Sequence, residues 1–173
     1  MSIKVNFFAS VYQREEPRTD SEFGINDAVQ QDGDEGFAYT TVENATKPWN
    51  AVVENSKCHE VLFLPLDHNI IIHPVPSAIY SLCDGMLIRK NEWIAFVELK
   101  VQNGNWIQHN IEQLESTIKL FCQNHDYSSF RHRVAYAANR KHPQFHYSHR
   151  VQMNEFYSKT KFRLLIQNNI TVK

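Results

Sequence analysis

The stretch CDGMLIRKNEWIAFVELKV, residues 83–101, places charged side chains inside two otherwise apolar runs. A short polar break separates the runs, so together they predict a β-hairpin. The second run is apolar on both sides, which is typical of a strand at the centre of a sheet that is covered on both faces. Asp84 opens the first run, and Glu98 and Lys100 interrupt the second. A buried charge without a partner costs several kcal/mol, so these groups must satisfy one another or bind a metal ion.

The rest of the chain predicts a mixture of strands and helices. Apolar residues recur every three or four positions over residues 106–122, which predicts an amphipathic helix. Residues 47–72 are rich in β-branched and aromatic side chains and predict two or three strands in antiparallel succession. Residues 131–139 predict a further strand, residues 151–160 a short helix, and residues 161–173 one or two strands. We therefore expect an α/β fold with a central mixed β-sheet.

Length and composition are those of a globular domain. The chain has 173 residues, of which 42% are hydrophobic and 5 are glycine, so we expect a single domain over residues 1–173. Residues 1–45 form an N-terminal extension of unassigned structure in this interpretation, and residues 18–37 within it read as a polar loop.

The sequence also predicts where the protein resides. Its apolar runs are far shorter than the roughly 20 residues of a membrane span, and its start lacks the long apolar segment of a signal peptide. We expect a cytoplasmic, soluble protein with no membrane contact. The three cysteines include no CxxC pair, so they indicate neither a disulfide framework nor a zinc cluster.

Three charged groups of the hairpin are placed to converge. Glu98 and Lys100 lie two residues apart on one strand and so point to the same face, while Asp84 begins the neighbouring strand. Two carboxylates with water between them suit Mg²⁺, or Mn²⁺, better than zinc. A lysine beside such a metal can orient the attacking water and stabilise charge that develops on a phosphoryl oxygen.

This Asp-x13-Glu-x-Lys arrangement resembles the PD-(D/E)XK nuclease superfamily. The matching residues are the CD pair at Cys83 and Asp84 and the ELK triplet from Glu98 to Lys100, with Cys83 in the place of the proline that names the motif. The resemblance implies that Asp84, Glu98 and the backbone carbonyl of Leu99 ligate the metal. It implies that Lys100 is the catalytic lysine.

The resemblance covers residues 49–136 and implies a restriction-endonuclease-like core, in which helices flank the central sheet. Several members carry a glutamine on the helix that follows the Glu-x-Lys strand, and Gln113 fits this position, with Gln108 as the other choice. Members also use an earlier glutamate, for which Glu43 and Glu54 are the two candidates.

The C-terminal quarter of the chain is basic. The formal net charge is −1, but residues 131–173 hold nine lysines and arginines against the single acid Glu155. If the substrate is a nucleic acid, four of these residues are expected to contact phosphates from positions that flank residues 134–138 on the same side as the carboxylates. They are Arg131, Arg133, Arg140 and Lys141. His142 and His146 have i, i+4 spacing, but Pro143 between them disfavours a helix, so this pair does not indicate a zinc site.

These features together predict a Mg²⁺-dependent deoxyribonuclease that cleaves phosphodiester bonds by attack of a metal-activated water. One alternative is a catalytically inactive nuclease-like module for nucleic-acid binding or assembly, and another is the same chemistry on RNA. At this length there is little room for a separate DNA-reading domain. Specificity would then come from loops, from a homodimer or from a partner protein.

Overall fold

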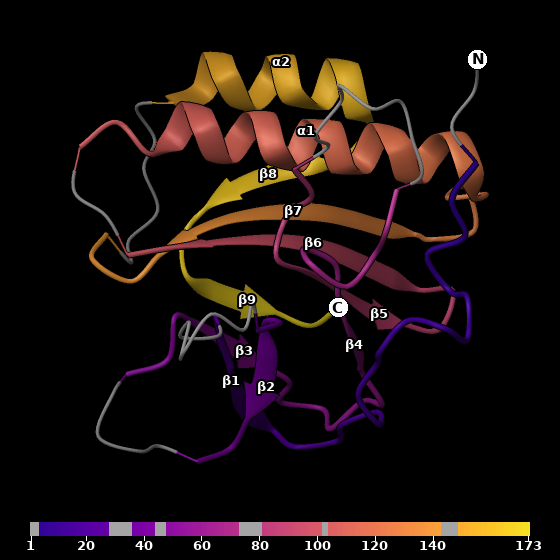
Figure 1. Cartoon of the computed structure of the whole chain (residues 1–173). Helices are drawn as coiled ribbons and strands as arrows, with labels where there is room; N and C mark the ends of the chain where they lie inside the picture. Colours follow the sequence, from indigo (N-terminus) through magenta and orange to yellow (C-terminus); the bar gives the residue numbers. More distant parts are fainter. Residues whose placement is uncertain (1–3, 28–35, 44–47, 73–80, 102–103, 143–148) are drawn as a thin grey trace.

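The protein forms three layers in a computed structural model: two helices, a five-stranded sheet, and a four-stranded sheet (Figure 1). The structure describes residues 4–27, 36–43, 48–72, 81–101, 104–142 and 149–173. The α/β class expected from the sequence is confirmed. Both sheets are mixed, and the helices and the second sheet cover opposite faces of the five-stranded sheet.

The five-stranded sheet contains the predicted hairpin. Its strands, in spatial order, are β4 (Leu62–Pro65), β5 (Gly85–Arg89), β6 (Trp93–Lys100), β7 (His132–Asn139) and β8 (Arg163–Ile166). β4, β5 and β6 pair antiparallel, whereas β6, β7 and β8 pair parallel. β6 is therefore the central strand, as its apolar sequence predicted.

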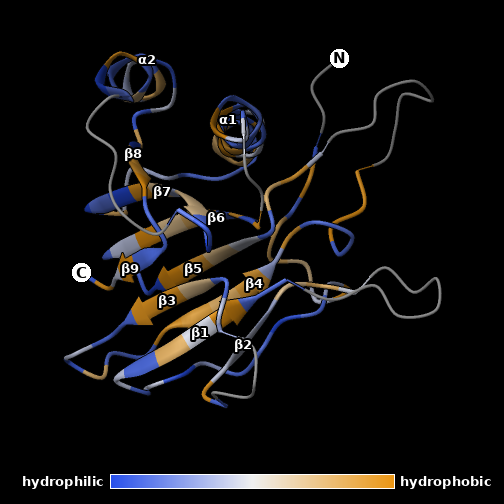
Figure 2. Ribbon diagram, turned by 90° about the vertical axis from the view of Figure 1, so that its left-hand side faces the viewer, coloured by the Kyte–Doolittle hydropathy of each residue, from blue (hydrophilic) through white to orange (hydrophobic). Residues whose placement is uncertain are grey.

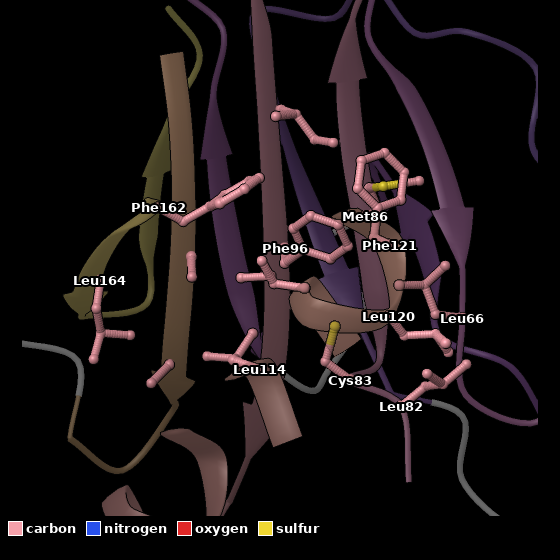
Figure 3. Close-up of a cluster of buried hydrophobic side chains, with 14 of the residues drawn as sticks. Leu66, Leu82, Cys83, Met86, Phe96, Leu114, Leu120, Phe121, Phe162 and Leu164 are labelled. Atoms are coloured by element: carbon pink, nitrogen blue, oxygen red, sulfur yellow. The ribbon is translucent and has the colours of Figure 1, made fainter. Parts of the chain in front are cut away.

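Two helices connect the parallel strands and lie on one face of this sheet. α1 (Ile107–Asn124) follows β6, and α2 (Arg150–Thr160) follows β7, so both predicted helices are confirmed. Aromatic rings fill the space beneath them: the ring centroid of Phe96 lies 5.3 Å from that of Phe121 and 5.6 Å from that of Phe162 (Figure 3). Burial of these large apolar side chains fixes α1 against β6.

The second sheet covers the other face. Its strands, in spatial order, are β2 (Tyr39–Thr41), β1 (Glu22–Asn26), β3 (Ala51–Glu54) and β9 (Asn169–Thr171). Phe23, Ile25 and Val53 from this sheet pack against Leu87 and Trp93 of the five-stranded sheet. Figure 2 shows the two sheets stacked below the helices, with β3, β4 and β5 coloured largely hydrophobic.

Two sequence-based expectations were wrong here. The segment 18–37 was expected to be a polar loop, but it contains β1, whose Phe23 and Ile25 are almost fully buried. Strands were expected to follow one another antiparallel within residues 47–72, but β3 and β4 belong to different sheets. β3 pairs instead with β1 and, in parallel, with β9 at the far end of the chain. Such pairing depends on distant segments, which local patterns do not encode.

The pleat of β6 divides its side chains between two cores. Trp93, Ala95, Val97 and Leu99 belong to the core between the sheets. Ile94 and Phe96 belong to the core under the helices. Because side chains alternate along a strand, Glu98 and Lys100 project to the helix face, at the end of β6 that leads into α1.

Candidate metal-binding site

Asp84 and Glu98 lie side by side where β5 begins and β6 ends. The antiparallel register pairs Gly85 with Val97, so the residue before Gly85 stands next to the residue after Val97. Asp84 Oδ2 accepts a hydrogen bond of 2.5 Å from the backbone N–H of Leu99. The structure therefore brings together the two carboxylates that the sequence singled out.

Glu98 and Lys100 form a close ion pair on the helix face. Lys100 Nζ lies 2.6 Å from Glu98 Oε1. The Glu98 side chain is only 1% exposed, whereas that of Lys100 is 22% exposed and reaches the surface. Glu98 Oε2 has no hydrogen-bond partner among the described residues. A buried carboxylate oxygen of this kind is costly unless something binds it, so its lone pairs are available to a ligand.

The Leu99 carbonyl faces the same gap. Lys100 O accepts the N–H of Arg140 at 3.1 Å on the β7 side. Backbone carbonyls of neighbouring strand residues point to opposite edges, so Leu99 O points to the β5 side. The N–H of Cys83, which would continue the ladder opposite Leu99, instead donates to Thr117 Oγ1 at 2.8 Å. The ladder thus ends here, and it leaves a backbone oxygen beside the two carboxylates.

Burial dominates the electrostatics of the two carboxyl groups. It raises the pKa of Asp84 to about 7, although the Leu99 N–H lowers that value. Burial, together with the Asp84 charge, raises the pKa of Glu98 to about 8 against the opposing effect of Lys100. Burial lowers the pKa of Lys100, but the Glu98 charge outweighs this effect and the net shift is upward. A divalent cation between the carboxylates would favour their charged forms.

Two further acids act on this site and were not predicted. Asp27 follows β1 and raises the pKa of Asp84, and Asp67, just beyond β4, raises the pKa of both Asp84 and Glu98. Among the described residues, however, no three His, Cys, Asp or Glu side chains form a metal-binding group, so these acids act at longer range. In the sequence, each of these acids is recognisable only as an acidic residue shortly after a strand. That position indicates a site near Asp84 only when the pairing of the strands is known.

Gln113 lies on α1 and holds the segment that leads to Asp84. Its Nε2 donates to Ser81 Oγ at 2.7 Å and lies 3.5 Å from Leu82 O. Thr117, one turn later, receives the Cys83 N–H and donates to Gln113 O at 2.8 Å. The polar side chains of Gln113 and Thr117 therefore contact protein, and Gln113 positions Asp84 through residues 81–83.

The alternative glutamine and glutamates take other places. Gln108 donates to Glu112 Oε1 on the exposed side of α1. Glu54 ends β3 and accepts a hydrogen bond from Asn169 in the second sheet. Glu43 lies exposed just beyond β2. None of these three contacts the carboxylates in the part of the chain that the structure describes.

The four predicted phosphate contacts do not form one patch. Arg140 and Lys141 follow the end of β7, where Asn139 pairs with Lys100, so they lie at the carboxylate end of the sheet. Arg133 lies at the start of β7, opposite Ile94, and Arg131 directly precedes this strand. The seven residue steps of β7 separate its ends by about 23 Å. The expectation that all four flank the site on one side is therefore wrong for Arg131 and Arg133.

The histidine pair is described in part. The His142 ring stacks on Trp106, with 6.2 Å between the ring centroids. His146 and Pro143 lie outside the described residues.

No described helix is both long enough and apolar enough to cross a membrane.

The raised pKa values predict how stability depends on pH when no metal is present. Folded Asp84 and Glu98 hold their protons up to pH values near 7 and 8, whereas their unfolded counterparts lose them near 3.8 and 4.5. The folded state binds more protons in this window, so these two groups should stabilise the protein at low pH and lose that contribution as pH rises from about 4 to 8.

Urea unfolding in EDTA at a series of pH values measures this effect. The Asp84→Asn, Glu98→Gln double variant lacks both titrations, so its stability should fall less between pH 5 and 8 than that of the wild type. Identical pH profiles for the two proteins would contradict the assignment. Added Mg²⁺ should stabilise the wild type more at pH 8 than at pH 6, because metal binding requires ionised carboxylates.

Comparisons with protein-family models, with curated proteins and with solved structures found no match to this chain. The arrangement of side chains is thus the basis for assigning a function. The buried carboxylate of Glu98, the half-buried carboxylate of Asp84, a backbone carbonyl and a surface-reaching lysine meet at one end of the central strand.

Proposed function

We propose that the protein is a metal-dependent nuclease that hydrolyses phosphodiester bonds of DNA. The observation that carries this proposal is Glu98, a carboxylate that is 1% exposed, with Oε2 unpartnered among the described residues and with Asp84 beside it. Two carboxylates close together among apolar strands destabilise the fold unless a cation or hydrogen-bond donors compensate their charge. The succession of strand, hairpin, helix and strand supports the resemblance to the PD-(D/E)XK superfamily.

The residues present fit a hard divalent cation. Asp84 and Glu98 would supply carboxylate oxygens and Leu99 its carbonyl oxygen, the ligand types that Mg²⁺ and Mn²⁺ prefer. The raised pKa values of both carboxyl groups mean that each gains from a nearby positive charge. When bound, the metal would lower the pKa of a water molecule and stabilise negative charge on the phosphate.

Lys100 would act at the mouth of the site. Its ammonium group is anchored by Glu98 but remains partly exposed, so it can reach a phosphate that approaches from solvent. There it would orient the attacking water and stabilise charge on a phosphoryl oxygen. In hydrolysis the water oxygen bonds to phosphorus, one phosphorus–oxygen ester bond breaks, and the leaving oxygen takes a proton.

Gln113 has a positioning role in this proposal. It tethers Ser81 and Leu82, and the chain then reaches Asp84 two residues later. Its Oε1 is buried and has no hydrogen-bond partner among the described residues. Loss of this tether would displace Asp84 relative to Glu98, which a metal-dependent reaction would not tolerate.

A cleavage assay on four substrates tests the proposal. Purified protein is incubated with plasmid, linear duplex DNA, single-stranded DNA and RNA, in Mg²⁺, Mn²⁺ or EDTA. We expect cleavage of DNA that requires the metal and that disappears in Asp84→Asn and Glu98→Gln. Glu112→Gln removes an acid from the exposed side of α1 and serves as the matched control with unchanged activity.

The other outcomes are equally informative. Cleavage of RNA but not of DNA would mean that RNA is the substrate, and it would leave the assignment of the site residues unchanged. A wild-type protein that cuts no nucleic acid with any metal would overturn the nuclease proposal.

A further inference from the structure

A second polar site lies at the opposite end of the five-stranded sheet from the carboxylates. The starts of β7 and β8 open into a pocket of about 250 Å³, here called the basic pocket. The cations that line it are Arg131, Arg133, Lys161, Arg163 and Lys173, and the His132 imidazole lies among them. No Asp or Glu is among the described residues that line it.

Segments far apart in the sequence build this cluster. Parallel pairing sets Val134 of β7 beside Arg163 of β8, which brings the start of β7 close to the C-terminal end of α2. Lys161 ends α2 in a left-handed conformation, and Lys173 follows β9. The fold thus gathers like charges that the chain keeps apart, and their repulsion opposes folding unless an anion offsets it.

The cations of the basic pocket are not neutralised within the described part of the chain. None of its lysines and arginines forms an ion pair with a described carboxylate, whereas Lys159 on the neighbouring turn of α2 pairs with Glu115 at 3.1 Å. The Arg133 guanidinium lies 5.5 Å from the centre of the Tyr127 ring, a contact that leaves its charge uncompensated. Lys161 Nζ donates to the backbone carbonyl of Ser158 at 3.0 Å. The pocket therefore presents several positive charges that have no ion-pair partner among the described residues.

An aromatic side chain lies beside these charges. Tyr157 of α2 lines the basic pocket and is 52% exposed. Proteins that bind single-stranded nucleic acid combine cations that contact the backbone with aromatic rings on which bases stack. At about 250 Å³ the pocket is smaller than most small-molecule sites, and its size suits a phosphate group with its sugar.

We propose that the basic pocket binds the phosphodiester backbone of a single nucleic-acid strand, with one base stacked on Tyr157. This goes beyond the proposed nuclease activity, because binding here needs neither a metal nor Asp84 and Glu98. The two sites are separated by the length of β7, about 23 Å, so one strand would need roughly seven stacked nucleotides to span them. A concave pocket of this size favours a flexible strand over a rigid duplex.

Anisotropy of a labelled single-stranded oligonucleotide in EDTA tests this binding without cleavage. The Arg131→Gln, Arg163→Gln double variant should bind at least about tenfold more weakly at low salt. Its plot of log K against log salt should be less steep by about 1.4, since each lost contact to a single strand removes about 0.7. The control variant Lys57→Gln, Lys119→Gln loses the same net charge from exposed positions outside the basic pocket and should bind like the wild type.

Tyr157→Leu separates stacking from charge. It should weaken binding at least about fivefold, the effect of losing one stacked base, and leave the salt dependence unchanged. All the substituted residues of the pocket are exposed, and thermal melts monitored by circular dichroism establish that each variant is folded.

Four results would overturn the proposal. One is an equal loss of affinity in the pocket and control variants, and another is tighter pocket-dependent binding of duplex than of single strands. A third is competition by inorganic phosphate at the same concentration as the oligonucleotide, which would make the pocket a site for free phosphate. The last is a variant with a lowered melting temperature and unchanged affinity, which would mean that the cations only offset the carbonyl end of α2.

Discussion

Replacing Lys100 by alanine is expected to slow cleavage by about 100-fold or more while affecting substrate affinity much less. The ammonium group stabilises charge that develops on the phosphate as the transition state forms, and removal of such a group usually costs a factor of this size. Single-turnover cleavage at saturating protein with Mg²⁺ measures the rate. Lys119→Ala, an exposed lysine of α1, is the matched control.

A purely structural lysine would give another result. Lys100 Nζ lies 2.6 Å from the buried Glu98 carboxylate, so a structural role predicts a loss of stability without a specific kinetic effect. The urea midpoint of the metal-free variant, measured beside the cleavage rate, distinguishes the two roles. A folded Lys100→Ala protein that cuts at the wild-type rate would exclude the catalytic role.

Removing either carboxylate is expected to abolish divalent-cation binding and, with it, cleavage. Asp84 and Glu98 are the two acidic ligands of the proposed site, and Mg²⁺ binds a lone carboxylate and a carbonyl only weakly. Isothermal titration with Mg²⁺ measures the loss in Asp84→Ala and in Glu98→Ala. Full Mg²⁺ affinity in Asp84→Ala would refute the ligand assignment.

The same variants should be at least as stable as the wild type when no metal is present. Burial raises the pKa of both carboxyl groups, and the Asp84 charge also raises that of Glu98, so removing either group removes a costly buried carboxyl and removing Asp84 also relieves Glu98. Asp84→Asn is the closer isostere, because its side-chain carbonyl oxygen can still accept the Leu99 N–H. Loss of activity with an unchanged or raised melting temperature would mark a functional role.

Local patterns in the sequence sufficed for the centre of the fold. The apolar runs on either side of Lys90 became β5 and β6, and the apolar stripe that begins at Ile107 became α1. The two-residue spacing of Glu98 and Lys100 placed both side chains on one face, because the strand period is two. The proximity of Asp84 followed from the hairpin, whose register a short connection fixes.

The second sheet was not predictable in the same way. β1 contains Gly24 in a segment of polar residues, and its burial depends on β3, whose other neighbour is β9 at the far end of the chain. No local pattern specifies that parallel pairing. Asp27, which follows β1, acts on Asp84 through this long-range arrangement, which becomes visible only once the strand pairing is known.

By itself, the sequence determined the hairpin, its three charged side chains and the helix behind it, because these features rest on contacts between residues near in the chain. The tertiary structure decided which of the basic residues share a surface. Arg131 and Arg140 are nine positions apart, and an extended strand of this length carries its ends to opposite sides of the molecule. Parallel pairing then brought Arg131 to Arg163 and Arg140 to Lys100, since neighbouring strands that run the same way align their starts with starts and their ends with ends.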